Sequence, residues 1–260
     1  MVPKLERIGK YTIDRKRRLG GGQFGTVYLG TDENGKVVAA KEIMLHDLGD
    51  DDPDPDWIAR VHGEIETHRR IPSHVNIVKY IDSVQEDNIM WVFTEPCKGG
   101  DLRKYLKNNN ISERQKFVIM RELAEAIKHL HTQNPAISHR DVKAENILMG
   151  DDGHIKLCDL GLAKITEKKG DRTETLLTHC GTKEYMAPEL FRLYEDNKAK
   201  YTKKVDIFSL GIFYVTLVEI SSGQSLQVFT GKKSLLNTHV HKFKYLYVHY
   251  NACDIIGGGW

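Results

Sequence analysis

The sequence predicts an α+β protein in which a small β-sheet with one helix precedes a mainly helical part. From Tyr11 to Glu95, short runs of β-branched and aromatic residues alternate with turn signals. After Asp101, apolar residues recur at helical spacing, and the apolar stretch 207–220 predicts a further helix. With 260 residues, 40% hydrophobic and 28% charged, the composition excludes collagen, a disulfide miniprotein and a mostly disordered chain.

The predicted sheet consists of four runs: TVYLG, KVVAAKEI, NIVKYI and NIMWVFTE. One helix, Trp57 to Ile71, interrupts them, because its apolar residues share one face. These residues are Ile58, Val61, Ile65 and Ile71. Asp56 ends an acidic loop before this helix, and two interpretations stay open: a solvated loop, or a cap that favours the helix dipole.

The helical part is predicted to begin with DLRKYLKNN and a longer helix that follows a capping box at Ser112 and Gln115. The apolar face of the longer helix is predicted to hold Phe117, Met120, Leu123, Ala124, Ile127 and Leu130. Short extended segments follow, AISHRD, ENILM and HIKLCDLG, and lead through a polar loop to the apolar helix in VDIFSLGIFYVTLVEI.

Composition also limits the partners and the compartment. Lys and Arg total 38 against 36 Asp and Glu, and a net charge of +2 does not indicate nucleic acid or an anionic membrane as a partner. The four cysteines are far apart and form no C-x-x-C pair, which favours a reduced compartment. The N-terminus lacks an apolar signal region, so we expect a cytoplasmic protein, with the nucleus as the alternative. The oligomeric state stays open.

The first chemical signal is a glycine-rich run, Leu19-Gly20-Gly21-Gly22-Gln23-Phe24-Gly25-Thr26-Val27. A dinucleotide fingerprint would open a helix, and a P-loop would end in Gly-Lys-Ser/Thr. This run instead continues into TVYLG and the turn at Asn34-Gly35, which predicts a β-hairpin. Backbone without Cβ atoms can approach a polyphosphate closely, although glycines also serve ordinary turns.

Lys41 lies between apolar residues in VVAAKEI, where an unpaired ammonium would be costly. Glu64 and Glu66 on the predicted helix are candidate partners, and the helical offset favours Glu64. An exposed edge lysine is the alternative.

Three further motifs follow in order: His139-Arg140-Asp141-Val142-Lys143-Ala144-Glu145-Asn146, Asp159-Leu160-Gly161 and Ala187-Pro188-Glu189. With the glycine run and Lys41, they make the sequence resemble the eukaryotic protein kinase superfamily from about Tyr11 to Ile220. The resemblance implies a bilobal fold and transfer of the ATP γ-phosphate to Ser or Thr hydroxyls of protein substrates. Lys143 and the segment Gly181–Tyr185 resemble serine/threonine rather than tyrosine kinases.

The resemblance also implies roles for individual residues. Asp141 and Lys143 are implied in catalysis, together with Lys41, which holds phosphates and pairs with Glu64. Asn146 and Asp159 are implied as Mg²⁺ ligands. The residues implied to surround ATP are Leu19, Gly20, Gly22, Gly25, Val27, Ala39, Lys41, Glu95, Cys97, Asp101 and Leu148. Of these, Glu95 C=O and Cys97 N–H are implied to meet adenine after the gatekeeper Thr94.

Several features depart from the family pattern. Leu160 replaces the usual Phe, and His68 stands where an aliphatic residue is usual, so a buried His68 needs a partner. Thr178 is a candidate phosphosite, with Thr173 and Thr175 as rivals and an unmodified loop as the alternative. The tail histidines His239, His241 and His249 lack convincing ligand spacing for a metal.

The resulting domain prediction has four segments. They are an N-terminal extension (1–10), a kinase N-lobe (11–96), an incomplete C-lobe (97–220) and an atypical tail (221–260). No arginine follows Ser221, so Glu189 is expected to lack the partner that it has in the family. The alternative function is therefore an ATP-binding or scaffold protein with impaired catalysis.

Overall fold

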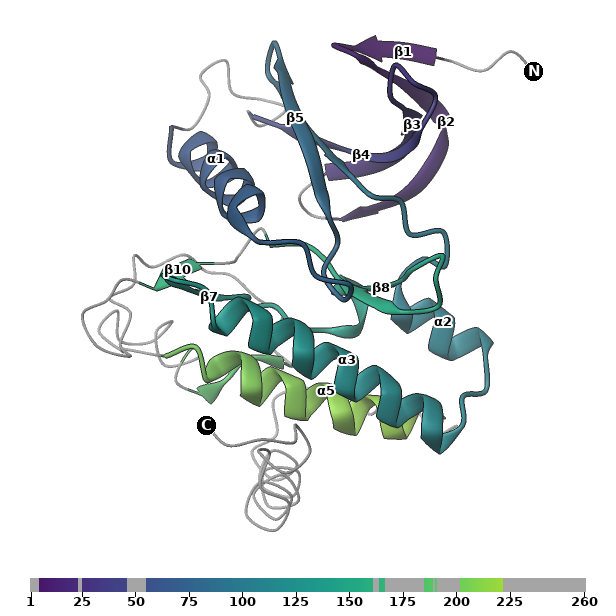
Figure 1. Cartoon of the computed structure of the whole chain (residues 1–260), viewed down its shortest axis with the longest axis vertical. Helices are drawn as coiled ribbons and strands as arrows, with labels where there is room; N and C mark the ends of the chain where they lie inside the picture. The colour runs from purple at the N-terminus through teal and green to yellow at the C-terminus, as the bar shows by residue number, and fades with distance from the viewer. Residues whose placement is uncertain are drawn as a thin grey trace. The chain divides into compact units, whose positions relative to one another are not determined.

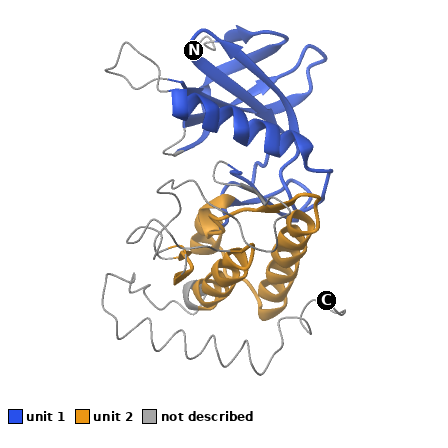
Figure 2. Cartoon of the chain, turned by 90° about the vertical axis from the view of Figure 1, so that its left-hand side faces the viewer, with its two compact units in different colours: residues 1–102, 147–163 blue, residues 103–146, 164–260 orange. Residues whose placement is uncertain are grey.

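The computed structural model describes residues 5–22, 25–45, 55–160, 164–166, 185–188, 190 and 202–221. The chain forms two units, coloured separately in Figure 2. Unit 1 comprises residues 1–102 and 147–163, and unit 2 comprises residues 103–146 and 164–260. Unit 1 contains most of the β-structure and unit 2 most of the helix, as the predicted α+β class requires.

Unit 1 is built on a six-stranded antiparallel sheet with strand order β1-β2-β3-β4-β6-β5 (Figure 1). The strands are β1 (Leu5–Ile8), β2 (Tyr11–Gly22), β3 (Gly25–Thr31), β4 (Val37–Met44), β5 (Tyr80–Glu86) and β6 (Ile89–Thr94). A two-stranded hairpin, β8 (Ile147–Met149) and β9 (Ile155–Leu157), also belongs to unit 1. The sheet predictions for β3, β4 and β6 are confirmed to within two residues.

The two faces of the sheet pack against different partners, because side chains alternate along each strand. In β6, Trp91 and Phe93 join a core with Ile8, Tyr11 and Ile13 from the first two strands. The intervening Met90 and Val92 face the other way and pack against α1 (Pro55–Arg70) through Val61 and Ile65. The helix predicted for this region is confirmed, although Asp56 lies inside its first turn rather than before it.

The run NIVKYI is a strand only from Tyr80 onwards. Its first half is apolar for another reason: Ile77 and Val78 are buried and pair with β9. Val78 N–H donates to the Leu157 carbonyl (2.9 Å), and Leu157 N–H donates to the Asn76 carbonyl (2.8 Å). The strand prediction is therefore wrong for the first half of this run, which pairs with β9 and not with the six-stranded sheet.

The segment predicted as an N-terminal extension contributes a strand to the sheet. β1 pairs with β2, and Ile8 is buried in the core. The turn after β1 contacts β5, because Gly9 N–H donates to the Glu86 carboxylate (2.9 Å) and Lys10 pairs with Asp82 (2.9 Å).

Unit 2 is mainly helical. Its elements are α2 (Leu102–Asn108, which starts at the unit boundary), α3 (Glu113–His131), β7 (Ala136–Ser138), the 3₁₀ turn η1 (Ala144–Asn146), β10 (Lys164–Thr166) and α5 (Val205–Ser221). Helices α3 and α5 lie side by side (Figure 1). No helix in the described ranges combines the length and the apolar character that crossing a membrane requires.

The capping box predicted for α3 is confirmed. Gln115 N–H donates to the Ser112 hydroxyl, and Ser112 N–H donates to the Gln115 side chain (2.8 Å). The predicted apolar face is wrong at one position, because Phe117 is 56% exposed. The buried stripe instead begins at Lys116, whose stem is covered while its ammonium reaches Glu113 (2.6 Å). Phe117, about 100° further round the helix, lies outside this stripe.

Candidate functional site

The glycine run lies in a β-hairpin, as predicted. Gly20 pairs with Val27 and Gly22 pairs with Gly25, while Gln23 and Phe24 lie outside the described residues. Gly25 has φ +129°, and a Cβ there would lie 1.8 Å from the Glu42 carbonyl oxygen, so only glycine fits. A Cβ at Gly20 would touch nothing within 4 Å. Packing does not require glycine at position 20, which favours close approach of a ligand.

Lys41 on β4 lies between two carboxylates of unit 1. Its Nζ is 3.2 Å from Asp159 Oδ1 and 3.9 Å from Glu64 Oε1 on α1. Burial alone would lower the pKa of Lys41, but the charges of Asp159 and then Glu64 outweigh burial and raise it. The ammonium therefore stays positively charged at neutral pH.

Burial has the opposite consequence for Glu64. It raises the pKa of the Glu64 carboxyl to about 7, although the Lys41 ammonium lowers it in part. Glu64 is therefore partly protonated at neutral pH, and its ion pair with Lys41 strengthens as pH rises above about 7.

Replacing Glu64 by glutamine should remove a pH dependence of stability between about pH 4.5 and 7. In that window the folded wild type keeps the Glu64 proton and the unfolded chain releases it, so stability falls as pH rises. At about 1.4 kcal/mol per pKa unit, the free energy of unfolding of the wild type should fall by roughly 2 to 3 kcal/mol more than that of Glu64→Gln when the pH is raised through this window. Urea denaturation at pH 5 and pH 8 measures this difference. The control is Glu66→Gln on the exposed side of α1, and equal losses in wild type and Glu64→Gln would contradict the prediction.

His68 follows Glu64 by one helical turn and has the partner that its burial requires. Its Nε2 lies 2.7 Å from the Val78 carbonyl oxygen, which can only accept, so Nε2 carries the proton. Burial lowers the pKa of His68 and keeps the ring neutral, and the ring packs edge-on against Tyr80 with centroids 5.6 Å apart. This departure from the family pattern is accommodated without an uncompensated buried charge.

The residues implied to meet the adenine lie where β6 ends and at the β8–β9 hairpin. Thr94 is the last residue of β6, and Asp101 forms a bridge with Leu148. Gly100 N–H donates to the Cys97 carbonyl (3.4 Å), and the Gly100 carbonyl accepts from Met149 N–H (2.9 Å). Burial raises the pKa of the Cys97 thiol to about 12, so the thiol is neutral.

Other residues of unit 1 that are implied to surround ATP differ in their exposure to solvent. Ala39 is buried, Val27 and Leu148 are half-buried, and Leu19 is exposed.

The second group of predicted site residues lies in unit 2. The Asp141 carboxylate accepts from Lys143 Nζ (2.7 Å) and from Asn146 Nδ2 (2.8 Å). Asn146 Nδ2 also donates to the Asp141 carbonyl (2.9 Å), and Asp141 N–H donates to His139 Nδ1 (3.3 Å). Asp141, Lys143 and Asn146 thus form one hydrogen-bonded cluster on a single loop.

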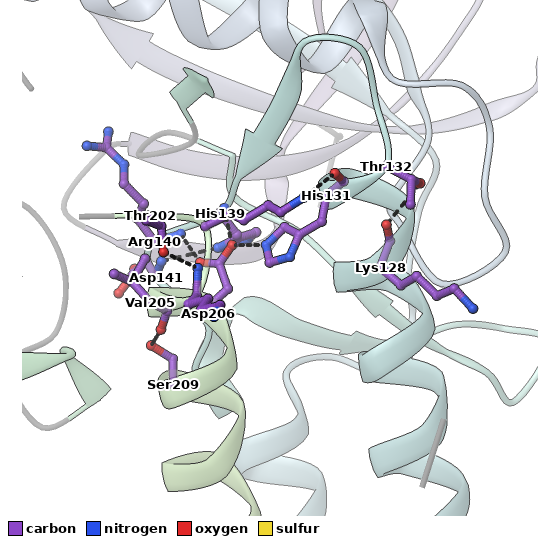
Figure 3. A network of polar contacts seen from close by, with 12 residues as sticks. Lys128, His131, Thr132, His139, Arg140, Asp141, Thr202, Val205, Asp206 and Ser209 are labelled. Atoms are coloured by element: carbon purple, nitrogen blue, oxygen red, sulfur yellow. Dashed lines mark hydrogen bonds and ion pairs between the residues drawn. The ribbon is translucent and has the colours of Figure 1, made fainter. Parts of the chain in front are cut away.

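Asp206 holds the backbone of this loop (Figure 3). Its carboxylate accepts from His139 N–H (2.9 Å) and Arg140 N–H (2.7 Å), and the His131 Nε2 lies 2.7 Å away. Arg140 has φ +68°, a left-handed conformation that is unfavourable for a non-glycine residue and must be held by its surroundings. Burial would raise the pKa of Asp206, but the hydrogen bond and charge of His131 outweigh burial and lower it.

Sequence reasoning missed two buried residues with polar contacts, His131 and Lys156. His131 contacts Asp206 across 75 positions of sequence, and no local pattern reveals that pairing. Lys156 is buried in β9 between Ile155 and Leu157. The argument that singled out Lys41, a lysine between apolar residues, applies equally to Lys156 and would have found it.

The donors implied for magnesium fit that ion in kind. Asn146 directs its amide nitrogen at Asp141, which leaves Oδ1 as the donor for a metal, and Asp159 supplies a carboxylate. Magnesium is usually held by one or two carboxylates with waters and substrate phosphates. Among the described residues there is no group of three or more His, Cys, Asp or Glu that could hold a metal.

Several predictions concern residues outside those the structure describes. They are the phosphosite candidates Thr173, Thr175 and Thr178, the segment Gly181–Glu184, Glu189 and the tail 222–260. Their outcome stays a prediction.

Known proteins resemble this chain over most of its length. The protein kinase domain family matches residues 13–248. Serine/threonine-protein kinase KIC1 of Saccharomyces cerevisiae is 38% identical over 210 residues, which cover 80% of this chain and 18% of the yeast protein. A probable serine/threonine-protein kinase of Dictyostelium discoideum is 34% identical over 222 residues, with 83% and 22% covered. Serine/threonine-protein kinase cds1 of Schizosaccharomyces pombe is 35% identical over 205 residues, with 77% and 43% covered.

The chain spans about a fifth of the length of the first two of these relatives. The family match runs beyond Ile220, where the resemblance of the motifs ends, and includes part of the segment 221–260. A match of this extent, with relatives above 30% identity, confirms the predicted fold class and shows that this chain belongs to the eukaryotic protein kinase superfamily.

Proposed function

We propose that this chain is an ATP- and Mg²⁺-dependent protein serine/threonine kinase. The observation that carries the proposal is the cluster in which Lys143 and Asn146 fix the Asp141 carboxylate. Phosphoryl transfer needs a positioned acceptor hydroxyl and neutralised phosphate charge rather than covalent chemistry. Proteins with these motifs, and the relatives named serine/threonine-protein kinases, support the choice of Ser and Thr as acceptors.

In the proposed reaction, Asp141 accepts the proton of the substrate hydroxyl and orients its oxygen toward the γ-phosphorus. Lys143 supplies a positive charge next to that position, because its Nζ is 2.7 Å from Asp141 Oδ2. Lys41, kept charged by Asp159 and Glu64, holds the phosphates. Asn146 and Asp159 would hold magnesium, which neutralises phosphate charge when bound.

We also propose a place for the nucleotide. The glycine hairpin (Gly20, Gly22 and Gly25) is assigned to the phosphates, and the Glu95 carbonyl and Cys97 N–H to the adenine. Asp101 is assigned to the ribose. The apolar side chains assigned to the faces of the base are Leu19, Val27, Ala39 and Leu148. The segments 11–96 and 97–220 are proposed as the two lobes, with β1 of the segment 1–10 added to the sheet of the first and a tail (221–260) after the second.

The variant Asp141→Asn tests the proposed function. Because an asparagine amide cannot take the hydroxyl proton, we expect transfer of radiolabelled γ-phosphate to a mixture of protein substrates to fall by about 10² to 10⁴-fold. The control is Glu113→Gln, which removes an exposed carboxylate of α3. Phosphoamino acid analysis should find label on Ser and Thr.

Each outcome of this assay has a definite meaning. Equal incorporation by wild type and Asp141→Asn would contradict the proposed role of Asp141. Mg-ATP binding without any transfer by the wild type would select the alternative of a catalytically impaired ATP-binding or scaffold protein. Thermal denaturation of both variants separates lost chemistry from lost folding.

A further inference from the structure

Lys156 is a buried lysine of unit 1 that the proposed reaction does not use. It is the central residue of β9 and is only 7% exposed, and its neighbours Ile155 and Leu157 are buried as well. A lysine is rarely buried unless its ammonium is paired. The partners of Lys156 therefore indicate what the residue does.

The ammonium of Lys156 contacts three segments of unit 1. Its Nζ donates to the Val75 carbonyl (3.0 Å) in the loop after α1 and lies 3.3 Å from Glu95 Oε2. It also lies 3.6 Å from Asp152 Oδ2 in the β8–β9 turn. An ammonium has three N–H groups, and each can be directed at one of these oxygens.

The hairpin is shaped around the stem of Lys156. A Cβ at Gly150 would lie 2.5 Å from Asp152 Oδ1, 2.9 Å from Lys156 Cε and 3.0 Å from the His154 carbonyl oxygen. Any larger residue at position 150 would therefore displace the lysine or the turn. Glycine at position 150 therefore leaves room for the stem of Lys156 and for the Asp152 carboxylate beside it.

Glu95 is held at both carboxylate oxygens. Oε1 accepts from Lys79 N–H (2.8 Å), and Oε2 faces Lys156, while Glu95 N–H donates to the Lys79 carbonyl (3.0 Å). Lys156 also pairs across the hairpin with Leu148 in the β8–β9 register. Lys156 thus contacts Glu95 and lies opposite Leu148 in the hairpin. Both of these residues are assigned to the adenine.

We propose that Lys156 is a positioning residue for the nucleotide. It fixes the segment Glu95–Cys97 through the Glu95 carboxylate and ties that segment to the hairpin that carries Leu148. The inference rests on the proposed function, because it takes the adenine as the group that this segment meets. Without the lysine, the Glu95 carboxylate loses its positive partner while Asp152 stays nearby, so we expect the segment to move.

Lys156→Met tests the proposal, because methionine keeps the apolar stem over Gly150 and removes the charge. The matched control is Lys98→Met: Lys98 also pairs with a carboxylate of the β8–β9 turn, Asp151 at 3.0 Å, but its side chain is 66% exposed. Lys156→Arg is the conservative variant that restores a positive charge. Both kinetic constants, the dissociation constant of Mg-ADP and the melting temperature are measured for all four proteins.

We expect Lys156→Met to raise the KM for ATP and the Kd of Mg-ADP about tenfold, the size expected for a lost hydrogen bond to a charged group. The KM for the protein substrate and kcat should change less than about threefold. Lys156→Arg should recover part of the loss, and Lys98→Met should match the wild type. A purely structural lysine would lower the melting temperature and leave both nucleotide constants of the folded fraction unchanged, which would overturn the proposal.

Hydrogen exchange gives a readout that needs no activity. Peptides covering 75–80 and 94–98 should exchange faster in Lys156→Met than in Lys98→Met, because the bonds between Lys79 and Glu95 lose their support. The double variant Glu95→Gln/Lys156→Met should bind Mg-ADP more tightly than Lys156→Met, since it removes the unpaired carboxylate. Unchanged exchange in Lys156→Met would refute the positioning role.

The outcomes separate this inference from the proposed function. A wild type that binds Mg-ADP but transfers no phosphate refutes the kinase activity, while the binding and exchange comparisons still decide the role of Lys156. A wild type that binds no nucleotide refutes both.

Discussion

Replacing Asp206 by alanine is expected to lower the free energy of unfolding by about 3 to 5 kcal/mol, because it breaks a fully buried, charged hydrogen-bond network. Two backbone N–H groups, of His139 and Arg140, and the His131 ring lose their acceptor at once. Urea denaturation measures the change. The control is Lys204→Ala, which changes an exposed residue directly before α5. A loss below about 1 kcal/mol would show that the network contributes little.

The same variant should also reduce phosphoryl transfer in the protein that remains folded. Arg140 has a left-handed backbone next to Asp141, and the hydrogen bond from its N–H to Asp206 helps to hold that conformation. Release of that conformation would move the Asp141 carboxylate away from Lys143 and Asn146. We therefore expect kcat to fall more than the KM for ATP. Asp206→Asn, which keeps one acceptor oxygen, should lie between wild type and Asp206→Ala in both measurements.

The sequence predicted those parts of the fold that depend on local patterns. The hairpin of the glycine run followed from its continuation into TVYLG and the turn at Asn34-Gly35, and the start of α3 followed from the Ser112–Gln115 capping box. The part of β2 before the glycine run escaped prediction because the centre of this strand is highly charged and contains register shifts between Asp14 and Gly20. β1 escaped because four residues show too little alternation for a strand to be recognised.

The residues of the candidate site also fall into two groups: those that are close in the sequence and those that only the fold brings together. The resemblance of HRDVKAEN to the kinase motif grouped Asp141, Lys143 and Asn146, and their contacts lie within five positions of sequence. The contacts of Asp206 with His131 and of Lys156 with Glu95 span 75 and 61 positions, and only the folded chain brings these residues together. For these two pairs, the sequence can show that a buried charge needs a partner, but not which residue provides it.

Replacing Lys41 by methionine is expected to reduce phosphoryl transfer by about 10² to 10³-fold, the effect typical of removing one preorganised electrostatic partner. The ammonium is the positive charge between Asp159 (3.2 Å) and Glu64 (3.9 Å). Without it, the half-buried carboxylates of Asp159 and Glu64 lose the positive charge between them, and the phosphates lose the ammonium proposed to hold them. Mg-ATP titration calorimetry and the radiolabel assay measure binding and transfer separately, with the exposed Lys36→Met as control.

The pH dependence of Lys41→Met gives this prediction a second test. Lys41 lowers the pKa of Glu64 from the value that burial and Asp159 would impose, so its loss should raise that pKa above about 7. At pH 7.5 Glu64 would then be protonated in the folded variant. The loss of stability that accompanies the ionisation of Glu64 would therefore occur at higher pH than in the wild type. Carbonyl NMR titration of Glu64 in wild type and Lys41→Met follows this directly. An unchanged Glu64 titration would mean that Lys41 and Glu64 are not electrostatically coupled in solution, and the proposed role of their ion pair would be wrong.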